Sequence, residues 1–419
     1  MSASARAAAT AVVRVLQDAG HVAYFAGGCV RDELLGHPPN DYDVATDATP
    51  ERLTAIFKHT RRVGAHFGVI QVHKLGHVIE VATFRADSPY SDKRRPDSVR
   101  FSDAREDAAR RDFTVNALFL DPLDAGSHGP RSPAGGRVID FVGAMDDLGR
   151  RVLRAVGDPD QRLAEDHLRA LRAVRLASKL EFTIDAGTAA GIVRHATELA
   201  GVSRERIGDE VRQMLAHHTR ARAVGLLGEL RLDGPVLTEA CQGGQELRYL
   251  SALEPGASVP LALAAWALDR GHPPTGSPEG IARRWRSAMC LSNQEDSALC
   301  GYLTLVGELI GEWSGAAVAR QKRIAAAHGF HGALRLLGTL EPLLAARIHA
   351  RREDLAATPS GLNPRPLASG DDLIRSGLSP GPRFKAMLER VYDAQLEDRV
   401  VNLEQAVRLA KELAGAKGV

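Results

Sequence analysis

Hydrophobic and polar residues follow two different spacings in the first third of the chain. Residues 5–19 place apolar side chains at three- and four-residue intervals, which predicts a helix that ends at Gly20. Residues 22–28, 42–46 and 67–85 carry short apolar or alternating runs, which predict strands. We therefore expect a small mixed domain of helices and strands in this part of the chain.

Turn and cap residues divide these runs. The long run over residues 67–85 is expected to form two strands that join near Gly76, because glycine favours tight turns. A helix is expected after Thr49, whose side chain can cap it and which is followed by a proline. Residues 86–103 are rich in turn-forming residues and are predicted to be a loop.

The pattern changes after about residue 150. From residue 158 to about residue 356 the spacing is mostly helical, and residues 162–180 are predicted to form one continuous helix. Residues 357–370 have the composition of a linker, and residues 370–401 are expected to form two short helices and a turn. The fold class expected from the pattern is α+β, with a mixed N-terminal sheet domain followed by an all-helical remainder.

Composition narrows the class of protein. A chain of 419 residues is too long for one compact core, so two to four domains are expected. The net charge of +2 excludes a strong global field, although arginines cluster locally. The four cysteines are widely spaced and form no CxxC pair, so neither a zinc site nor a disulfide framework is expected from them. No signal peptide or membrane-length apolar run is found, so we expect a cytoplasmic protein.

An acid pair follows a glycine turn near the N-terminus. Asp41 and Asp43 stand at positions i and i+2 of an expected strand, so both carboxylates project to one face. Carboxylates that close repel each other unless a cation lies between them, and hard oxygen ligands suit Mg²⁺. Upstream, Gly27 and Gly28 allow a backbone to approach a polyphosphate, and Arg31 can add a charged contact to it. The alternative is a tight turn followed by a solvated strand edge.

Glu80 is a second candidate. It stands between Ile79 and Val81 in an apolar strand, where an acid without a partner is costly. It is interpreted as a third metal carboxylate, with a simple edge-strand glutamate as the alternative.

The third candidate is the segment from Arg110 to Asn116. Arg111 is interpreted as a contact to a triphosphate or ribose, and Asp112 as a contact to a sugar hydroxyl or a supporting hydrogen bond. Asn116 follows Asp112 by four residues. The alternative is a charged helix start with an internal hydrogen bond.

The fourth candidate is a charged stripe on the helix expected over residues 162–180. Asp166 and Arg169 are three residues apart, so their side chains can meet, and Arg172 and Arg175 continue the stripe. Cytosine and adenine both present an amino donor beside a ring-nitrogen acceptor. A carboxylate accepts from the first and a guanidinium donates to the second, whereas guanine and uracil have the reversed polarity. The pair could thus admit C and A without a template. A solvated helix face is the alternative.

These segments occur in an order and spacing that resemble a known family. They are "GGCVRDELLGHPPNDYDVAT", "YSDKRRPDSVRF", "RRDFTVNALFLD", "VIDFVGAMDDL", "RAVGDPDQRLAEDHLRALRAVRLA" and "ERIGDEVRQML". Together they closely resemble the class II tRNA nucleotidyltransferases (CCA-adding enzymes) and bacterial poly(A) polymerases of the DNA polymerase β superfamily. The resemblance is dense from about residue 20 to residue 220 and weak over residues 221–360.

The resemblance implies a layout and a set of roles. The expected parts are a catalytic head (1–150), a neck that selects the base (151–220), a body (221–358) and a tail (359–419). Asp41 and Asp43 would be the metal-binding catalytic pair, with Glu80 carried over less securely. The nucleotide would be held by a larger set of residues: Gly27, Gly28, Arg31, Arg111, Asp112, Asn116, Asp166, Arg169, Arg172 and Arg175. Asp92 and the arginines after it would belong to a loop that takes part in the switch from C to A addition.

The resemblance also implies a reaction. The 3′-hydroxyl of a tRNA would attack the α-phosphate of CTP or ATP in line and release pyrophosphate, with two Mg²⁺ ions expected as cofactors. RNA is the expected polymer partner, and neither DNA nor a membrane is expected. Poly(A) polymerases carry an element of a glycine, two basic residues and a phenylalanine. This chain has Ala65 and His66 in the places of the two basic residues, which favours CCA addition. An A-adding specialist, a CC-adding specialist and a non-catalytic RNA-binding protein remain alternatives at this point.

Overall fold

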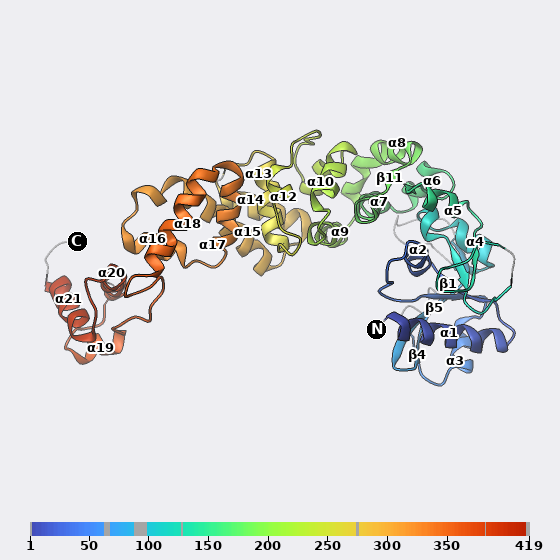
Figure 1. Ribbon diagram of the computed structural model, residues 1–419, viewed down its shortest axis with the longest axis horizontal. Helices are drawn as coiled ribbons and strands as arrows, with labels where there is room; N and C mark the ends of the chain where they lie inside the picture. Colours follow the sequence, from blue (N-terminus) through green and yellow to red (C-terminus); the bar gives the residue numbers. More distant parts are fainter. Residues whose placement is uncertain are drawn as a thin grey trace. The chain divides into compact units, whose positions relative to one another are not determined.

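The structure is a computed structural model that describes residues 2–62, 68–87, 99–126, 129–273, 276–381 and 383–415. Asp92 with the arginines after it, and Ala65 with His66, lie outside these residues. Contacts divide the chain into two compact units. The first unit comprises Met1–Met214 and Arg222–Gly244, and the second comprises Leu215–Ala221 and Gln245–Val419. Figure 1 follows the chain from the sheet-bearing residues, in blue and cyan, to the helices drawn in orange and red.

The first unit is built on a mixed sheet of seven strands. In their order across the sheet these are β3 (Thr60–Arg62), β4 (Val69–Lys74), β5 (His77–Thr83), β2 (Val44–Thr46), β1 (Ala23–Ala26), β8 (Phe119–Asp121) and β9 (Arg137–Ile139). The pairing is antiparallel except between β2 and β5, which run parallel. The central strands β1 and β2 are almost wholly buried, as expected for strands covered on both faces.

Several of the expected boundaries are confirmed. Helix α1 (Ser2–Asp18) precedes Gly20, and α3 (Pro50–Ile56) begins after Thr49, whose side chain accepts a hydrogen bond from the Arg52 backbone N–H at 3.4 Å. The two strands β4 and β5 meet at Gly76, whose φ is +77°. Such a φ suits glycine because it has no Cβ.

Two expectations from the pattern are wrong. The described ends of residues 86–103 are not loop but part of a two-stranded ribbon formed by β6 (Arg85–Asp87) and β7 (Val99–Phe101). The ladder between them is set by a pairing partner that local turn composition does not reveal. The single helix expected over residues 162–180 is two helices, α6 (Pro159–Glu165) and α7 (Arg169–Leu180).

Helices cover the sheet and extend the first unit. They are α2 (Gly28–Leu34), α4 (Ala104–Ala109), α5 (Ala144–Gly149), α8 (Ala186–His195), α9 (Arg204–Ala216), α10 (Arg220–Glu229) and α11 (Asp233–Leu237), of which α9 and α10 straddle the division between the units. Short 3₁₀ turns η2 (Thr114–Asn116) and η3 (Ala196–Gly201) lie between them, and β10 (Val152–Leu153) pairs with β11 (Thr183–Ile184).

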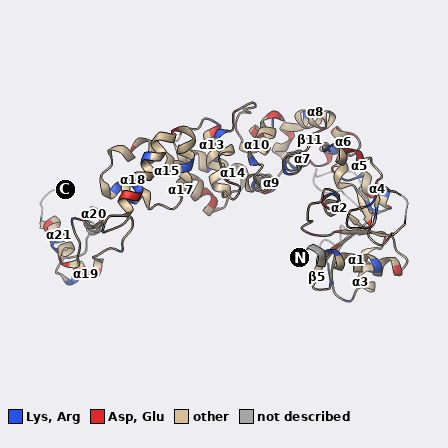
Figure 2. Cartoon of the chain, viewed as in Figure 1, with Lys and Arg blue, Asp and Glu red and all other residues tan. Residues whose placement is uncertain are grey.

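The second unit is helical throughout its described residues. Its helices are α12 (Arg248–Ser251), α13 (Val259–Asp269), α14 (Pro278–Met289), α15 (Asn293–Gly311), α16 (Val318–Ala325), α17 (Phe330–Leu340), α18 (Pro342–Ala356), α19 (Gly370–Arg375), α20 (Phe384–Leu396) and α21 (Leu403–Gly415), with the 3₁₀ turn η4 (Trp313–Gly315). Trp266 and Trp285 pack in its core with ring centroids 5.4 Å apart. None of the described helices has the length and apolar character that a bilayer-spanning segment requires. Basic residues, coloured blue, and acidic residues, coloured red, occur along both units (Figure 2).

Candidate active site

Asp41 and Asp43 lie immediately before the central strand β2. The pattern had predicted that both acids lie within the strand. The strand instead begins at Val44, so the two acids precede it. The alternation still holds, because Tyr42 is buried between two exposed aspartates. The backbone of Asp43 is fixed by the Ala26 N–H, which donates to its carbonyl at 3.0 Å. The backbone of Asp43 is therefore anchored to strand β1, and Asp41 lies two residues before it.

Glu80 joins this acid pair through the register of the sheet. In the parallel pairing of β2 with β5, Val44 stands opposite Val81, so the preceding residues Asp43 and Glu80 fall side by side. Glu80 is exposed, and its carboxylate accepts a hydrogen bond from Gln71 at 3.1 Å. The third carboxylate suggested by the sequence thus lies next to the other two.

The surroundings of Asp43 raise the pKa of its carboxyl group. Protein atoms withdraw water from the group although the residue as a whole is exposed, and the negative charges of Asp41 and Glu80 add to this effect. Together they raise the pKa of Asp43 to about 6, against an attractive contribution from Arg111. Three acids with so little positive charge beside them are an unfavourable arrangement in the absence of a cation. The donor set, made only of carboxylate oxygens, suits Mg²⁺.

The glycine turn brings a backbone against Arg111. Gly27 has a φ of +78° and a ψ of −129°, a conformation that residues with a Cβ rarely adopt. A Cβ at this position would lie 2.9 Å from Nη1 of Arg111. Gly28 begins helix α2, and a Cβ there would lie 3.6 Å from Nη2 of Arg31. Gly27 therefore makes room for the guanidinium group of Arg111, whereas a Cβ at Gly28 would make only an ordinary van der Waals contact with Arg31.

Arg111 is held in place by Asp107. Its Nη2 donates to Oδ2 of Asp107 at 2.9 Å, and its Nη1 donates to the carbonyl of Asn116 at 3.0 Å. Arg110 binds the other oxygen of the same carboxylate at 2.6 Å. Burial by itself raises the pKa of Asp107, but Arg111 and Arg110 outweigh burial and hold the pKa below its ordinary value.

Arg31 and Asn116 connect the turn to the segment after α4. Arg31 is almost completely buried; its Nε donates to Oδ1 of Asp32 at 2.8 Å, and its Nη1 donates to the side-chain oxygen of Asn116. Asp32 thus orients Arg31. In the same network, Nδ2 of Asn116 donates to Oδ1 of Asp112 at 3.2 Å.

Asp112 joins the sheet domain to the helices after it. Its Oδ2 pairs with Nη2 of Arg172 on α7 at 2.7 Å, and its backbone carbonyl accepts from the Val156 N–H at 3.2 Å. Burial raises the pKa of Asp112, but Arg172 and the donors from Asn116 and Phe113 lower it below its ordinary value. The carboxylate is therefore ionised and committed to this network.

The structure corrects the expected Asp166–Arg169 pair. Asp166 ends α6 and Arg169 begins α7, so the two residues are not three apart on one helix. The Asp166 carboxylate accepts from the Leu168 backbone N–H at 3.1 Å and from Arg206 at 2.7 Å. Arg169 donates to the Arg162 carbonyl at 2.6 Å and pairs with the Glu165 carboxylate. What does link the predicted pair is the Arg169 backbone N–H, which donates to the Asp166 carbonyl at 3.0 Å.

Arg175 is paired away from the other predicted residues. Its Nε donates to Oε2 of Glu210 on helix α9 at 2.6 Å. The structure therefore brings Asp41, Asp43, Glu80 and Arg111 together electrostatically, and links Arg31, Asn116, Asp112 and Arg172 by hydrogen bonds and an ion pair.

Two supporting residues were not identified from the sequence. Asp107 precedes Arg111 by four residues, and that spacing on a helix was a usable signal. Arg206 lies forty residues from Asp166 and had no local signal, because only the packing of α9 brings it there.

Comparison with known proteins covers nearly the whole chain. The family model described as the poly A polymerase head domain matches residues 23–154, and the model for a probable RNA and SrmB-binding site of polymerase A matches residues 181–240. The CCA-adding enzyme of Limosilactobacillus fermentum is 35% identical over 408 residues, which span 96% of this chain and 95% of that protein. The CCA-adding enzyme of Lactiplantibacillus plantarum is 31% identical over 412 residues, 96% of this chain and 94% of that protein.

Solved structures show the same fold. A crystal structure of the Bacillus stearothermophilus CCA-adding enzyme in complex with CTP superposes with a TM-score of 0.75 at 28% identity, covering 97% of both chains. The Thermotoga maritima CCA-adding enzyme complexed with tRNA superposes with a TM-score of 0.67 at 16% identity, covering 97% of this chain and 94% of that one. The second likeness bears on the fold alone.

Proposed function

Because this chain belongs to the CCA-adding tRNA nucleotidyltransferases, we propose that its N-terminal unit holds one CTP or ATP at a time and joins it to the 3′ end of a tRNA. The observation that carries this proposal is the cluster of Asp41, Asp43 and Glu80. Burial, with the added negative charges of Asp41 and Glu80, raises the pKa of Asp43, and such a cluster favours a bound cation. Relatives that match over their full length are CCA-adding enzymes, which favours CCA addition over poly(A) addition.

Asp41 and Asp43 are the residues that would hold the divalent ions, with Glu80 as a third carboxylate. Two Mg²⁺ ions held by these carboxylates would lower the pKa of the attacking 3′-hydroxyl and would neutralise charge on the leaving pyrophosphate. The sheet contributes rigidity: the backbone of Asp43 is hydrogen-bonded to β1, and the register with β5 fixes Glu80 beside it. Rigid placement of reacting groups is a large part of catalysis in phosphoryl transfer.

The guanidinium groups around the glycine turn would bind the triphosphate. Arg111 is anchored by Asp107 with its side chain about one-fifth exposed, so it keeps a fixed position and a solvent-facing edge. Arg31 is oriented by Asp32 and Asn116. Two such pre-oriented cations lose little freedom when an anion binds. Asp112 and Asn116 would border the ribose.

Base selection would fall to the junction between α6 and α7. A carboxylate at Asp166 and a guanidinium at Arg169 can bind the amino group and ring nitrogen that cytosine and adenine share. In the structure Arg206 orients the first, and Glu165 pairs with the second. Arg172 and Arg175 would contact phosphate or the RNA end, after release of Arg172 from Asp112 or of Arg175 from Glu210.

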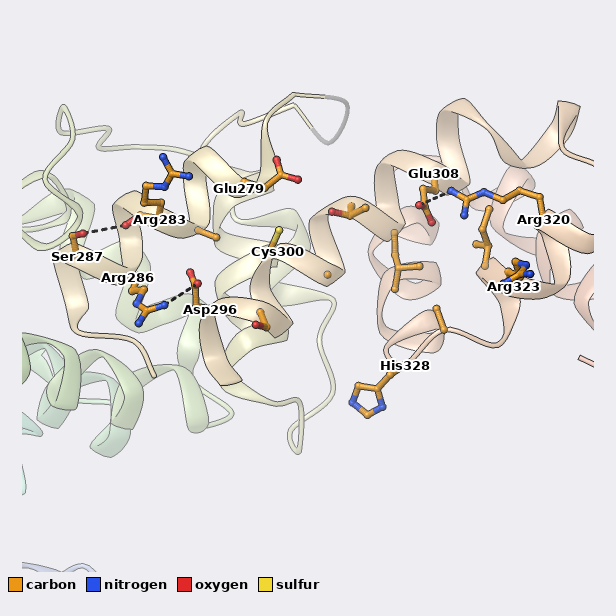
Figure 3. A pocket seen from close by; sticks show the side chains of 17 residues that line it. Glu279, Arg283, Arg286, Ser287, Asp296, Cys300, Glu308, Arg320, Arg323 and His328 are labelled. Atoms are coloured by element: carbon orange, nitrogen blue, oxygen red, sulfur yellow. Dashed lines mark hydrogen bonds and ion pairs between the residues drawn. The ribbon is translucent and has the colours of Figure 1, made fainter. Parts of the chain in front are cut away.

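The second unit offers a surface for the RNA. A groove of about 920 Å³ lies between α14, α15 and α16 and is lined by Arg283, Arg286, Arg320 and Arg323 (Figure 3). Three of these arginines pair with acids of the same unit. The exposed guanidinium of Arg283 has no hydrogen-bond or ion-pair partner among the described residues. It is therefore the lining arginine best placed to meet an RNA phosphate.

The experiment is extension of a tRNA that ends at the discriminator base, with labelled CTP and ATP. Addition of C, C and A in that order supports the proposal. A product that stops at CC, addition of A only to tRNA ending in CC, or long A tails on unrelated RNA would each refute it. The Asp41→Ala and Asp43→Ala variants should lose activity by several orders of magnitude, and an active variant would refute the metal assignment.

A further inference from the structure

Two histidines and one glutamate form a cluster that is not part of the proposed nucleotide site. His167 comes from the turn between α6 and α7, His195 ends α8, and Glu198 belongs to η3. The three residues can each offer one ligand atom, and these atoms all lie within 4.8 Å of one another. His167 is 3% exposed, so one of the three is deeply buried.

The carboxylate of Glu198 lies between the two imidazole rings. Its Oε2 is 3.0 Å from Nε2 of His167, and its Oε1 is 3.1 Å from Nδ1 of His195. The rings are stacked with centroids 6.1 Å apart. Ligand atoms of a tetrahedral zinc ion are separated by about 3.3 Å, which follows from metal–ligand distances of about 2.0–2.1 Å. The two nitrogen–oxygen separations, one to each oxygen of Glu198, are close to that value, and the three ligand atoms lie within 4.8 Å of one another.

The second nitrogen of His195 adds an independent constraint. Its Nε2 is 3.2 Å from Oδ1 of Asp160, a carboxylate that Arg194 also binds at 2.7 Å. Both ring nitrogens of His195 thus face carboxylate oxygens, which only accept hydrogen bonds. A neutral imidazole carries one proton, so one nitrogen lone pair would face a negative oxygen. Either a second proton or a metal ion at Nδ1 removes this conflict.

We propose that His167, His195 and Glu198 bind a divalent transition metal of the zinc class. With the metal at Nδ1 of His195, the Nε2–H donates to Asp160, the arrangement in which an outer carboxylate orients a metal-bound histidine. Imidazole and carboxylate ligands in a three-residue set suit zinc, with solvent completing the coordination. The cysteine spacing gave no sign of such a site, because its ligands come from separate segments of the chain.

The site would fasten the junction of α6 and α7 to the end of α8. His167 follows Asp166 directly, so the metal would restrain the turn that carries one member of the base-selecting pair. This site is separate from the one proposed at Asp41 and Asp43, whose carboxylates suit magnesium and belong to another cluster. The proposal for zinc stands whether or not the assigned roles in nucleotide transfer are correct.

The test is zinc binding to the full-length, metal-free protein in competition with a chromophoric chelator. One zinc ion per chain is expected, and Co²⁺ in its place should give the visible absorption of a four-coordinate site. His195→Gln and Glu198→Gln should each weaken zinc binding by more than about 100-fold, because a direct ligand is lost. Asp160→Asn should weaken it by about 10- to 100-fold, because only an outer partner is lost.

Two controls make the result specific. His218→Gln removes an exposed histidine outside the cluster and should bind zinc like the wild type. Asp41→Ala combined with Asp43→Ala removes the other carboxylate pair and should also bind one zinc ion. Unchanged affinity in both His195→Gln and Glu198→Gln would overturn the proposal. So would the absence of stoichiometric zinc binding by the wild type, which would leave the cluster as ion pairs of protonated histidines. Glu198 is partly exposed, so its variant remains informative if a histidine variant fails to fold.

Discussion

At the scale of single residues, Gly27 shows how a backbone conformation serves a side chain elsewhere. Its positive φ and the nearness of Arg111 leave no room for a Cβ, although neither fact is visible in the sequence. Arg111 cannot simply turn aside, because Asp107 and the Asn116 carbonyl hold its guanidinium. The glycine and the arginine are therefore one structural feature.

This predicts the effect of Gly27→Ala. The new methyl group should displace Arg111, lower kcat/KM for CTP by about 100-fold, and cost about 1–3 kcal/mol of stability through backbone strain. The matched control is Gly20→Ala, which has a φ of +84° but no atom within 4 Å of the new Cβ. It should share the strain and keep its activity. Steady-state kinetics and thermal unfolding decide the matter, and full activity in Gly27→Ala would contradict the role given to Arg111.

The pKa of Asp43 predicts how the acid cluster responds to pH. In the metal-free protein this carboxyl group has a pKa of about 6, so it is mostly ionised above pH 6 and mostly protonated below. Protons then compete with Mg²⁺, and affinity should fall about tenfold for each pH unit below 6. Calorimetric titration with Mg²⁺ between pH 5 and pH 8 would measure this. An affinity independent of pH over that range would exclude Asp43 as a ligand.

The same pKa has a consequence for stability. Because the folded pKa lies above the unfolded value, ionised Asp43 opposes folding at pH 8, and this opposition is lost as pH falls through 6 toward 4. Asp43→Asn should therefore stabilise the metal-free protein at pH 8. Since the residue is exposed, solvent screening limits the gain to about 1 kcal/mol.

At the scale of elements, the break between α6 and α7 changes the expected geometry of Asp166 and Arg169, the residues proposed to select the base. A continuous helix would have placed Asp166 and Arg169 on one face, as the charge spacing suggested. In the structure Asp166 ends one helix, and helix α9 supplies the arginine that fixes its carboxylate. The proposed geometry of selection would thus depend on three helices rather than one.

This predicts a role for Arg206 in selection. Arg206→Met should free the Asp166 carboxylate and lower discrimination of CTP and ATP against GTP and UTP by about tenfold, with a smaller effect on the rate of correct addition. Arg212→Met, on the same helix and in an exposed pair with Asp209, is the matched control. Misincorporation assays with each nucleotide alone would measure the difference. Equal discrimination in the two variants would show that Arg206 does not position Asp166.

At the scale of the whole molecule, the first unit is proposed to bind the nucleotide and the second to contact the RNA. The carboxylates and guanidinium groups proposed to hold the nucleotide belong to the first unit, and the mixed-charge groove belongs to the second. Most arginines of that groove are neutralised by acids nearby, so its positive charge is local rather than general. A protein with a net charge of +2 can bind RNA only through such local surfaces.

Arg283→Glu tests this surface. The change should weaken tRNA binding by about tenfold and reduce the dependence of affinity on salt by about one ion, because one phosphate contact is lost. Binding of CTP should be unaffected. Arg14→Glu on α1 is an exposed control in the first unit. Filter binding of tRNA at several salt concentrations gives both quantities, and equal losses in the two variants would point to general electrostatics instead of a site.

The sequence by itself determined the order of the elements and the identity of the charged residues. Strands and helices were predictable where apolar spacing was regular, as in β4, β5 and α1, because that spacing reflects local geometry. Asp41 and Asp43 could be named from their spacing after a glycine turn, and Arg169, Arg172 and Arg175 from their helical spacing. Glu80 could be named because an acid in apolar surroundings is costly and therefore informative.

Only the tertiary structure decided which of these residues meet. The parallel register that sets Glu80 beside Asp43, the packing of α9 that brings Arg206 to Asp166, and the meeting of His167 with His195 and Glu198 all join distant segments. The β6–β7 ribbon and the break after Glu165 were missed for the same reason. Contacts between distant segments are fixed by burial and strand pairing across the fold. The spacing of residues within one segment does not specify which distant segment it will contact.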